Sequence, residues 1–284
     1  MLKLIAIGAV IGIANIIPGV SGGTMAVSMG VYDKLIYALT HIVKEWKKSL
    51  QLLIPIGIGA GIALVGLSKL ITYSLENVPV PTNLFFIGLI MGGMPAIWNR
   101  LKSTNEKVSV GNIVAGLFFF VLVVGFAMLG EGEGQDPAIA FTVVNAFKLF
   151  LVGIVASATM VIPGVSGSMV LMLMGYYESI LSNVSLCIDG LRAFDIPTMM
   201  TAVGVLAPFG IGVVIGIVLI AKLVELVFLK FPNYAYCSIM GLIAASPIAI
   251  VVMSDLKEYT IVPILIGMVT FTVGGIIAMK LGEK

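Results

Sequence analysis

The sequence predicts an all-α integral membrane protein made of two inverted-topology repeats, each a re-entrant helical hairpin followed by three transmembrane helices. Of the 284 residues, 60% are hydrophobic and 11% are charged, and the mean hydropathy is +1.15, whereas about 25% of residues are charged in soluble domains. The segment NIIPGVSGGT at 15–24 returns as MVIPGVSGSM at 160–169. Helix breakers repeated at corresponding places in two apolar halves are the best sequence pointer to a transporter's binding site.

The similarity extends to the flank before each motif. Aligned without a gap, Lys3–Gly23 and Lys148–Ser168 are identical at ten of 21 positions: K, L, G and V, followed by IPGVSG. The apolar stretch Met1–Ala14 resembles a signal peptide. Its near-copy at 148–159 lies in mid-chain and cannot be one, so we interpret both stretches as structure.

Composition excludes several classes of function. A formal net charge of +2 gives no indication of nucleic-acid binding. The two cysteines, Cys187 and Cys237, match no disulfide or metal-site spacing. The single histidine, His41, excludes most multi-histidine metal sites. We therefore expect neither a metal nor a cofactor.

Apolar runs long enough to cross a membrane as helices, which takes about 20 residues, occur three times in each half. The expected spans are 52–73, 83–99, 108–130, 203–228, 234–253 and 260–279.

The motifs lie between shorter apolar pieces. These pieces are 4–17 and 24–40 around the first motif, and 149–162 and 169–181 around the second. Fourteen helical residues reach about 21 Å, which is short of a hydrocarbon core of about 30 Å. We therefore expect re-entrant hairpins at 4–40 and 149–181, with a motif at each tip. Such a tip must be buried by protein or line a wet cavity.

Loop charges predict the orientation. The loops at 41–50 and 99–107 each carry a net charge of +2, so the positive-inside rule makes them cytoplasmic. The corresponding loops at 182–198 and 254–260 are each net −1. One hairpin and three crossings per half make an odd count, so the second half must insert upside down. Both termini of this multi-pass cell-membrane protein are then cytoplasmic.

The boundary between the repeats falls at a polar segment. We expect repeat 1 at 1–130 and repeat 2 at 148–284, joined by an extracellular linker at 131–147. The linker begins EGEGQDP, which is polar and glycine-rich. Beyond the hairpins the register of the repeats continues at an offset of 153, which aligns Pro55 with Pro208.

Each motif has the chemistry of an anion site. Proline and glycine stop the incoming helix and permit a tight turn. The next helix starts with up to four unsatisfied N–H groups, which attract an anion together with the helix dipole. The candidate ligands are Ser21, Gly22, Gly23, Thr24, Ser166, Gly167 and Ser168. In the alternative, the hydroxyls only cap the helices and the small residues only allow close helix packing.

An anion site in a membrane also needs a cation. Lys69 and Lys222 occupy equivalent positions inside apolar runs, and a cation inside a span indicates function by default. Inversion would place Lys69 toward the outside and Lys222 toward the inside. In the alternative, both snorkel to the headgroups, and Lys222 pairs with Glu225 at i+3. Lys3 and Lys148 form a second equivalent pair.

Asp33 and Glu178 follow the two motifs at equivalent positions, each after a tyrosine. They are candidates for coupling or gating. In the alternative, they are interfacial residues beside tyrosine anchors. We expect His41, in a basic loop, to be a solvated surface residue.

One pattern is a false match. Gly19–Gly23 satisfies G-x-S-x-G, but the hydrolase nucleophile elbow needs a strand–turn–helix context and a histidine–acid partner. Here the flanks are apolar helices, and the second copy, Gly164–Ser168, breaks the pattern. We therefore expect no serine hydrolase.

The chain resembles the polyprenyl-phosphate transporter family, which includes undecaprenyl phosphate translocases. The resemblance rests on NIIPGVSGGT at 15–24, PGVSGS at 163–168 and the M-G-x-Y-[DE] tails at 29–33 and 174–178. It implies a flippase that returns the lipid carrier monophosphate from the outer to the inner leaflet for reuse in cell-envelope synthesis. The candidate site would then bind the phosphate headgroup. The second motif departs from the first at Ser168 and Met169, which argues against equal roles for the hairpins.

Two other functions stay open at this point. Membrane-embedded polyprenyl-diphosphate phosphatases also have inverted repeats and a P-G-x-S motif, but an arginine follows their serine, whereas glycine follows Ser21 and Ser166. A transporter of a small soluble anion would share every feature except a lateral opening for the lipid tail. The polyprenyl phosphate lipid is the expected partner, and the sequence defines no oligomeric state.

Overall fold

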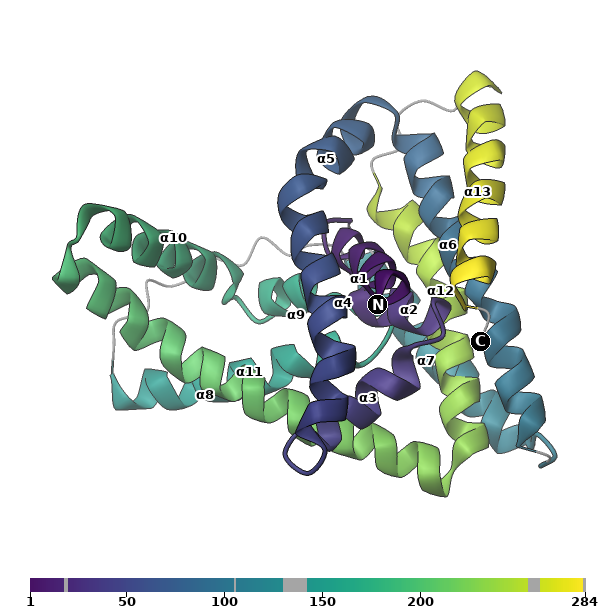
Figure 1. Ribbon diagram of the computed structural model, residues 1–284, viewed down its shortest axis with the longest axis horizontal. Helices are drawn as coiled ribbons and strands as arrows, with labels where there is room; N and C mark the ends of the chain where they lie inside the picture. The colour runs from purple at the N-terminus through teal and green to yellow at the C-terminus, as the bar shows by residue number, and fades with distance from the viewer. Residues whose placement is uncertain (18–19, 105, 130–141, 255–260, 283–284) are drawn as a thin grey trace. The chain divides into compact units, whose positions relative to one another are not determined.

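The computed structural model describes all residues except 18–19, 105, 130–141, 255–260 and 283–284, and the described part consists of helices joined by turns (Figure 1). Its helices are α1 Leu2–Ala14, α2 Gly22–Ser28, α3 Tyr32–Thr40, α4 Trp46–Gly66, α5 Ser68–Asn77, α6 Pro79–Ser103, α7 Val110–Leu129, α8 Val143–Val161, α9 Gly167–Leu173, α10 Tyr177–Ala193, α11 Ile196–Lys230, α12 Pro232–Met253 and α13 Ile261–Gly282. The chain forms two compact units. Unit 1 comprises Met1–Gly130, Ile162–Val165 and Ala221–Lys284, and unit 2 comprises Glu131–Val161 and Ser166–Ile220.

Within the described ranges, seven helices are long and apolar enough to cross a membrane. They are α4, α6, α7, α8, α11, α12 and α13. The bent pair α9 and α10, with 113° between its halves, would add an eighth crossing if it counts as one span. The prediction of an all-α, multi-pass membrane protein is confirmed. The expected linker at 131–147 lies mostly outside the described residues.

Two differences between the helices and the expected apolar pieces affect the candidate site. The apolar run 52–73 is not one helix, because α4 ends at Gly66 and α5 begins at Ser68. Leu67 joins them with backbone angles of φ −107° and ψ −8°. In the second hairpin, the limb expected at 149–162 begins at Val143, so α8 has 19 residues and reaches about 28 Å.

The outgoing limb of each expected hairpin is also broken. A seven-residue helix follows each motif, α2 in unit 1 and α9 in unit 2. Each ends before a glycine in the left-handed region, Gly30 at φ 68° and Gly175 at φ 71°, a conformation that favours glycine. The chain then turns into α3 or α10.

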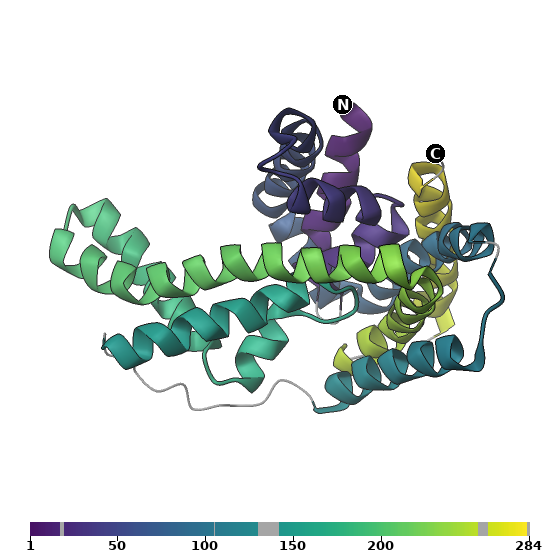
Figure 2. The ribbon, with the colours of Figure 1, turned by 90° about the horizontal axis from the view of Figure 1, so that it is seen from below.

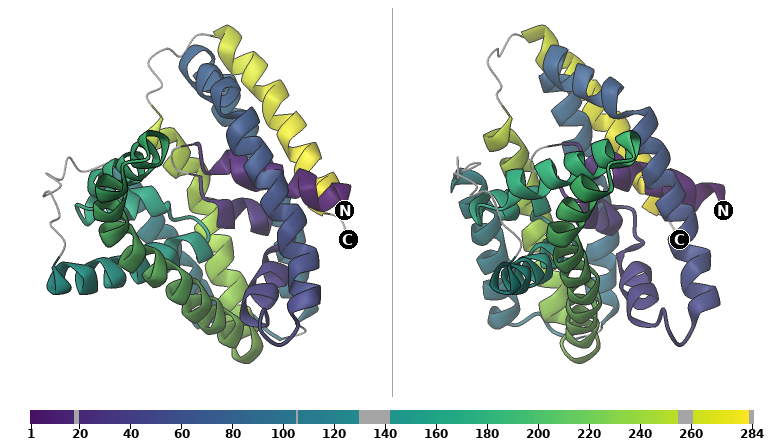
Figure 3. Two further views of the ribbon diagram at one scale, coloured as in Figure 1. Left: turned by 60° about the vertical axis from the view of Figure 1, so that its left-hand side comes forward. Right: turned by 90° about the vertical axis from the view of Figure 1, so that its left-hand side faces the viewer.

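The core of unit 1 is built on close helix pairs. α6 packs along α13, and α7 packs along α12 (Figure 3). Glycine allows these backbones to approach: a Cβ on Gly92 would lie 2.6 Å from the Gly275 carbonyl oxygen, and one on Gly116 would lie 2.8 Å from the Cys237 carbonyl oxygen. Small residues at membrane helix interfaces have this effect.

The same contact recurs inside each unit. α1 crosses α4 in unit 1, and α8 runs beside α11 in unit 2 (Figure 2). In each crossing two glycines face the partner helix's backbone so closely that a Cβ would overlap a carbonyl oxygen. The pairs are Gly8 with Ile56 and Gly59 with Ile5 in unit 1, and Gly153 with Phe209 and Gly212 with Phe150 in unit 2. The residues of the second set lie 145 or 153 positions after those of the first.

The helices α6 and α12 also begin alike. Each has proline in its first turn, where the missing N–H is not needed and φ is already helical. The residue before each proline has nearly the same backbone, with φ −137° and ψ 57° at Val78 and φ −137° and ψ 58° at Phe231. Their spacing is again 153 residues.

Candidate functional site

The first motif forms a closed hydrogen-bonded turn at the start of α2. Ser21 caps this helix, because its extended backbone lets the side-chain oxygen accept from the Thr24 backbone N–H at 3.1 Å. The hydroxyls of Ser21 and Thr24 lie 2.9 Å apart and share a hydrogen bond. Both side chains are buried, at 6% and 0% exposure. Pro18 and Gly19 lie outside the described residues.

The turn of the second motif meets the first inside unit 1. The Gly164 backbone N–H donates to the Ser21 hydroxyl at 3.0 Å and to the Thr24 hydroxyl at 2.8 Å. Gly23 packs against Pro163, where a Cβ would lie 3.3 Å from the proline Cα. The two copies, 143 residues apart at their hydrogen bonds, are therefore in direct contact. Both hydroxyls accept from the Gly164 N–H and are buried, so a phosphate could reach their protons only if the two turns moved apart.

The hydroxyls of the second motif are more accessible. Ser166 takes the cap position of α9, but its side chain makes no capping hydrogen bond. Its oxygen lies 2.8 Å from that of Ser168, which is exposed. The two pairs of hydroxyls thus differ. Ser21 and Thr24 bond to each other and also accept from the Gly164 N–H, whereas Ser166 and Ser168 bond to each other alone within the described residues.

The predicted cations lie on helix surfaces. Lys69 is the second residue of α5 and is exposed, and Lys222 is exposed on α11. No hydrogen bond or ion pair of either lysine occurs among the described residues. The structure therefore does not join them to the motif turns, and their part in headgroup binding stays a prediction.

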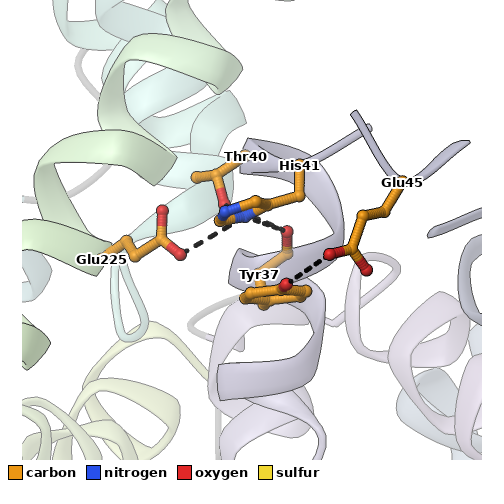
Figure 4. Close-up of polar contacts among 5 residues, drawn as sticks. All are labelled: Tyr37, Thr40, His41, Glu45 and Glu225. Carbon is orange, nitrogen blue, oxygen red and sulfur yellow. Dashed lines mark hydrogen bonds and ion pairs between the residues drawn. The ribbon is translucent and has the colours of Figure 1, made fainter. Parts of the chain in front are cut away.

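Glu225 does not pair with Lys222. Its carboxylate instead lies 3.5 Å from Nδ1 of His41, with side-chain exposures of 21% and 29% respectively (Figure 4). The His41 ring stacks on Tyr37, with ring centroids 4.1 Å apart and an angle of 15°. His41, expected to be a solvated surface residue, is partly exposed, and its ring also joins the end of α3 to the C-terminal part of α11.

A second carboxylate extends this cluster. The Tyr37 hydroxyl donates to Glu45 at 3.1 Å (Figure 4). Lys48 lies 2.9 Å from the other carboxylate oxygen. The hydrogen bond from Lys48, followed by that from Tyr37, lowers the pKa of Glu45. The same bond to Glu45 raises the pKa of Tyr37. The cluster therefore favours an ionised Glu45 beside a neutral Tyr37.

The carboxylates after the motifs have unlike surroundings. Asp33, in the first turn of α3, forms an ion pair with Arg100 at the end of α6. Arg100 also donates to the Gly30 carbonyl at 3.4 Å. Glu178 takes the equivalent place on α10, is exposed and has no ion pair within the described ranges. Sequence reasoning counted Arg100 only as a loop charge; its rarity, as one of two arginines with Arg192, was the available signal.

A small pocket adjoins the ion pair. Its volume of about 20 Å³ holds roughly one water molecule. Val27, Tyr32 and Ile97 contribute to its walls beside the ion pair, and Tyr236 of α12 lines it as well. Burial raises the pKa of Tyr32, so its hydroxyl stays neutral. The pocket combines one cation, one carboxylate and an apolar wall.

Comparison with known proteins identifies the family. Residues 11–265 match the model of an undecaprenyl phosphate translocase-like family. The chain belongs to this family. A polyprenyl-phosphate transporter of Staphylococcus aureus is 28% identical over 97% of this chain and 94% of its own length. One of Vibrio cholerae is 31% identical over 62% of this chain and 58% of its own length. No solved structure matches the chain.

Family membership decides between the classes of function that the sequence left open. The undecaprenyl phosphate translocase-like family is one of transporters, so the diphosphatase alternative is rejected. The resemblance found in the motifs is confirmed, because the matched region contains both motifs and both tails. The chain is a multi-pass membrane transporter and not an enzyme.

Proposed function

We propose that this protein is a polyprenyl-phosphate transporter that moves undecaprenyl phosphate from the outer to the inner leaflet, so that the lipid carrier is reused in cell-envelope synthesis. The observation that carries the proposal is the family match over residues 11–265. The near full-length relative with the same transported lipid in its name supports it. The direction follows the family resemblance of the motifs.

We further propose that repeats 1–130 and 148–284 are inverted copies joined by an extracellular linker at 131–147. The matching glycine contacts of α1 with α4 and of α8 with α11 support two copies of one packing unit. The equal lengths of α2 and α9 and the left-handed glycines after them support it too. The charge bias of the loops supports inversion, with both termini cytoplasmic.

The phosphate headgroup would bind at the motif turns, each of which offers its own donors. Backbone N–H groups and hydroxyls at 21–24 and 166–168 supply donors for a phosphate, and a helix start favours the negative charge. Ser168 is exposed and Ser166 partly so, whereas Ser21 and Thr24 are buried and would become accessible only if the two turns moved apart. Lys69 and Lys222 would assist from opposite membrane surfaces, and the polyprenyl tail would stay in lipid. Asp33 and Glu178 would act in gating.

Leaflet exposure of a labelled polyprenyl phosphate in proteoliposomes tests the function. Purified protein should speed exchange between leaflets without releasing phosphate. Lys69→Ala together with Lys222→Ala should slow exchange, whereas Lys230→Ala, another exposed lysine on α11, should not. Uptake of inorganic phosphate without lipid exchange would instead establish a small-anion transporter. Release of phosphate from the diphosphate lipid would restore the phosphatase.

A further inference from the structure

The ion pair between Asp33 and Arg100 sits at the C-terminal end of the short helix whose N-terminal end is the first motif. Ser21 caps α2 at one end, and Gly30 follows it at the other. The guanidinium of Arg100 contacts both the Gly30 carbonyl and the Asp33 carboxylate. One cation therefore binds the whole turn that connects α2 to α3.

This ion pair is open to a ligand. The side chains of Arg100 and Asp33 are 39% and 34% exposed, so water or an anion reaches the guanidinium without unfolding the helix. A fixed fork of N–H donors lets arginine bind a carboxylate or a phosphate through two parallel bonds. Asp33 thus holds the place that a phosphate oxygen would take.

The walls of the adjoining pocket suit the part of a lipid next to its headgroup. Tyr32 and Tyr236 line it together with Ile97, and both tyrosine rings pack on Phe228 of α11, at centroid distances of 6.2 and 5.3 Å. An isoprene unit is apolar and would contact such rings favourably. A pocket that holds about one water is too small for a phosphate while Asp33 stays on Arg100, so binding requires the carboxylate to move away.

We propose that Arg100 is the cation of a phosphate-monoester subsite, and that Asp33 occupies it while no headgroup is bound. This inference rests on the proposed transport of a polyprenyl phosphate. A headgroup that reaches Arg100 displaces the Asp33 carboxylate and takes its place on the guanidinium. The apolar walls then meet the first isoprene unit. Displacement also frees the turn at Gly30, which is the direct continuation of the motif helix.

Binding of farnesyl phosphate to the purified full-length protein in detergent tests the subsite. Arg100→Ala should weaken binding about 10- to 100-fold, as expected for the loss of charge-assisted hydrogen bonds. Asp33→Asn should tighten binding about two- to fivefold, because it removes an exposed competitor of the same charge as the ligand. Lys102→Ala removes the same charge two residues along α6, outside the pocket, and should leave affinity unchanged.

The opposite signs separate a binding role from a structural one. If the ion pair only holds α3 to α6, Arg100→Ala and Asp33→Asn should both destabilise the protein and both weaken binding, which would overturn the proposal. Should Arg100→Ala fail to fold, Arg100→Lys carries the test: it keeps the charge, loses the fork and should give intermediate affinity. Unchanged affinity in that variant would also overturn the proposal.

Two further ligands distinguish this inference from the function on which it rests. Farnesol, which lacks the phosphate, should not bind, and equal binding of farnesol would overturn the subsite. Inorganic phosphate should bind far more weakly than farnesyl phosphate. If inorganic phosphate binds equally well, with the same opposite effects of the two substitutions, and liposomes show no lipid exchange, then the subsite stands and transport of a lipid is refuted. If lipid exchange in liposomes is normal in both variants, transport stands and the subsite is refuted.

Discussion

The hydrogen bond that joins the two motifs makes a sharp prediction for a double-mutant cycle. The Gly164 N–H is buried and donates to two hydroxyls at once, those of Ser21 and Thr24. Ser21→Ala leaves the Thr24 hydroxyl as an acceptor, and Thr24→Val leaves that of Ser21. Only the double variant leaves the Gly164 N–H without any acceptor.

The size of the effect follows from the contacts. Ser21→Ala should cost about 2 kcal/mol, about half for the lost helix cap and half for the lost hydrogen bond to Thr24. Thr24→Val should cost about 1 kcal/mol for the same lost hydrogen bond. An orphaned buried N–H costs about 1–3 kcal/mol more in the double variant. The hydrogen bond between the two hydroxyls is lost in each single variant, so the sum of the singles counts it twice. The double variant loses it only once, which makes its cost about 1 kcal/mol smaller than that sum. The double variant should therefore exceed the sum of the singles by about 1 kcal/mol.

The second motif supplies the matched control. Ser166 and Ser168 also share a hydrogen bond, at 2.8 Å, but within the described residues no backbone N–H donates to either hydroxyl. The pair Ser166→Ala and Ser168→Ala therefore has the shared bond without the orphaned donor. Its double variant should cost slightly less than the sum of the singles. The two cycles thus have opposite signs.

Equilibrium unfolding in mixed detergent micelles measures both cycles. Independent sites add within about 0.5 kcal/mol, so a coupling near 1 kcal/mol is resolvable. If Ser21 and Thr24 couple with the same sign as Ser166 and Ser168, the Gly164 N–H does not depend on these hydroxyls, and the joining of the motifs by this bond is refuted.

Two further predictions concern packing and pH. Gly93→Ala should destabilise the protein by about 1–3 kcal/mol in thermal unfolding, because a Cβ there would overlap the backbone of Ser28, with the Ser28 carbonyl oxygen 2.7 Å away. Gly57→Ala is the control: a Cβ at Gly57 would have nothing within 4 Å, so this variant should be neutral or mildly stabilising. Glu45 has a folded-state pKa below its ordinary value of 4.5, chiefly through Lys48, so it contributes stability above pH 4.5 that is lost as the pH falls through the lowered pKa. Melting temperatures between pH 7 and pH 3 should therefore show Glu45→Gln less stable than wild type at neutral pH and the difference closing in acid; a difference that widens in acid would contradict the assignment.

Much of the helical architecture could be predicted, because helices that cross a bilayer need long runs of apolar residues. The apolar runs 83–99 and 234–253 lie inside α6 and α12, and each of these helices begins at a proline. The break at Gly66 could not be predicted, since the run from Ile62 to Leu67 is continuously apolar and hydropathy does not change there. Lys69 was therefore placed inside a span, whereas it lies at the start of a separate helix.

The candidate site was predictable only in part. The doubled motif indicated that two turns matter, and Ser21 does cap the helix that follows. Which group bonds which across the chain could not be predicted, because no local pattern encodes that the Gly164 N–H meets Ser21, 143 residues away. The pairing of Asp33 with Arg100 across 67 positions is of the same kind. The periodicity of apolar residues predicts where helices lie and which faces are buried. Hydrogen bonds and ion pairs between distant residues depend on how the helices pack together, which periodicity does not predict.

The contacts of α2 give a physical route between the two proposed binding places. This seven-residue helix is held at its start by the Gly164 N–H, on its side by Gly93, and after its end by Arg100 at Gly30. It is too short to be stable by itself in water, where isolated helices below about 12–15 residues are marginal, so these three contacts fix its position. A headgroup that displaces Asp33 weakens the contact at Gly30, and a phosphate reaches the buried Ser21 hydroxyl only when the contact with Gly164 opens. Either event frees one end of the same rigid turn, so binding at one end should favour binding at the other.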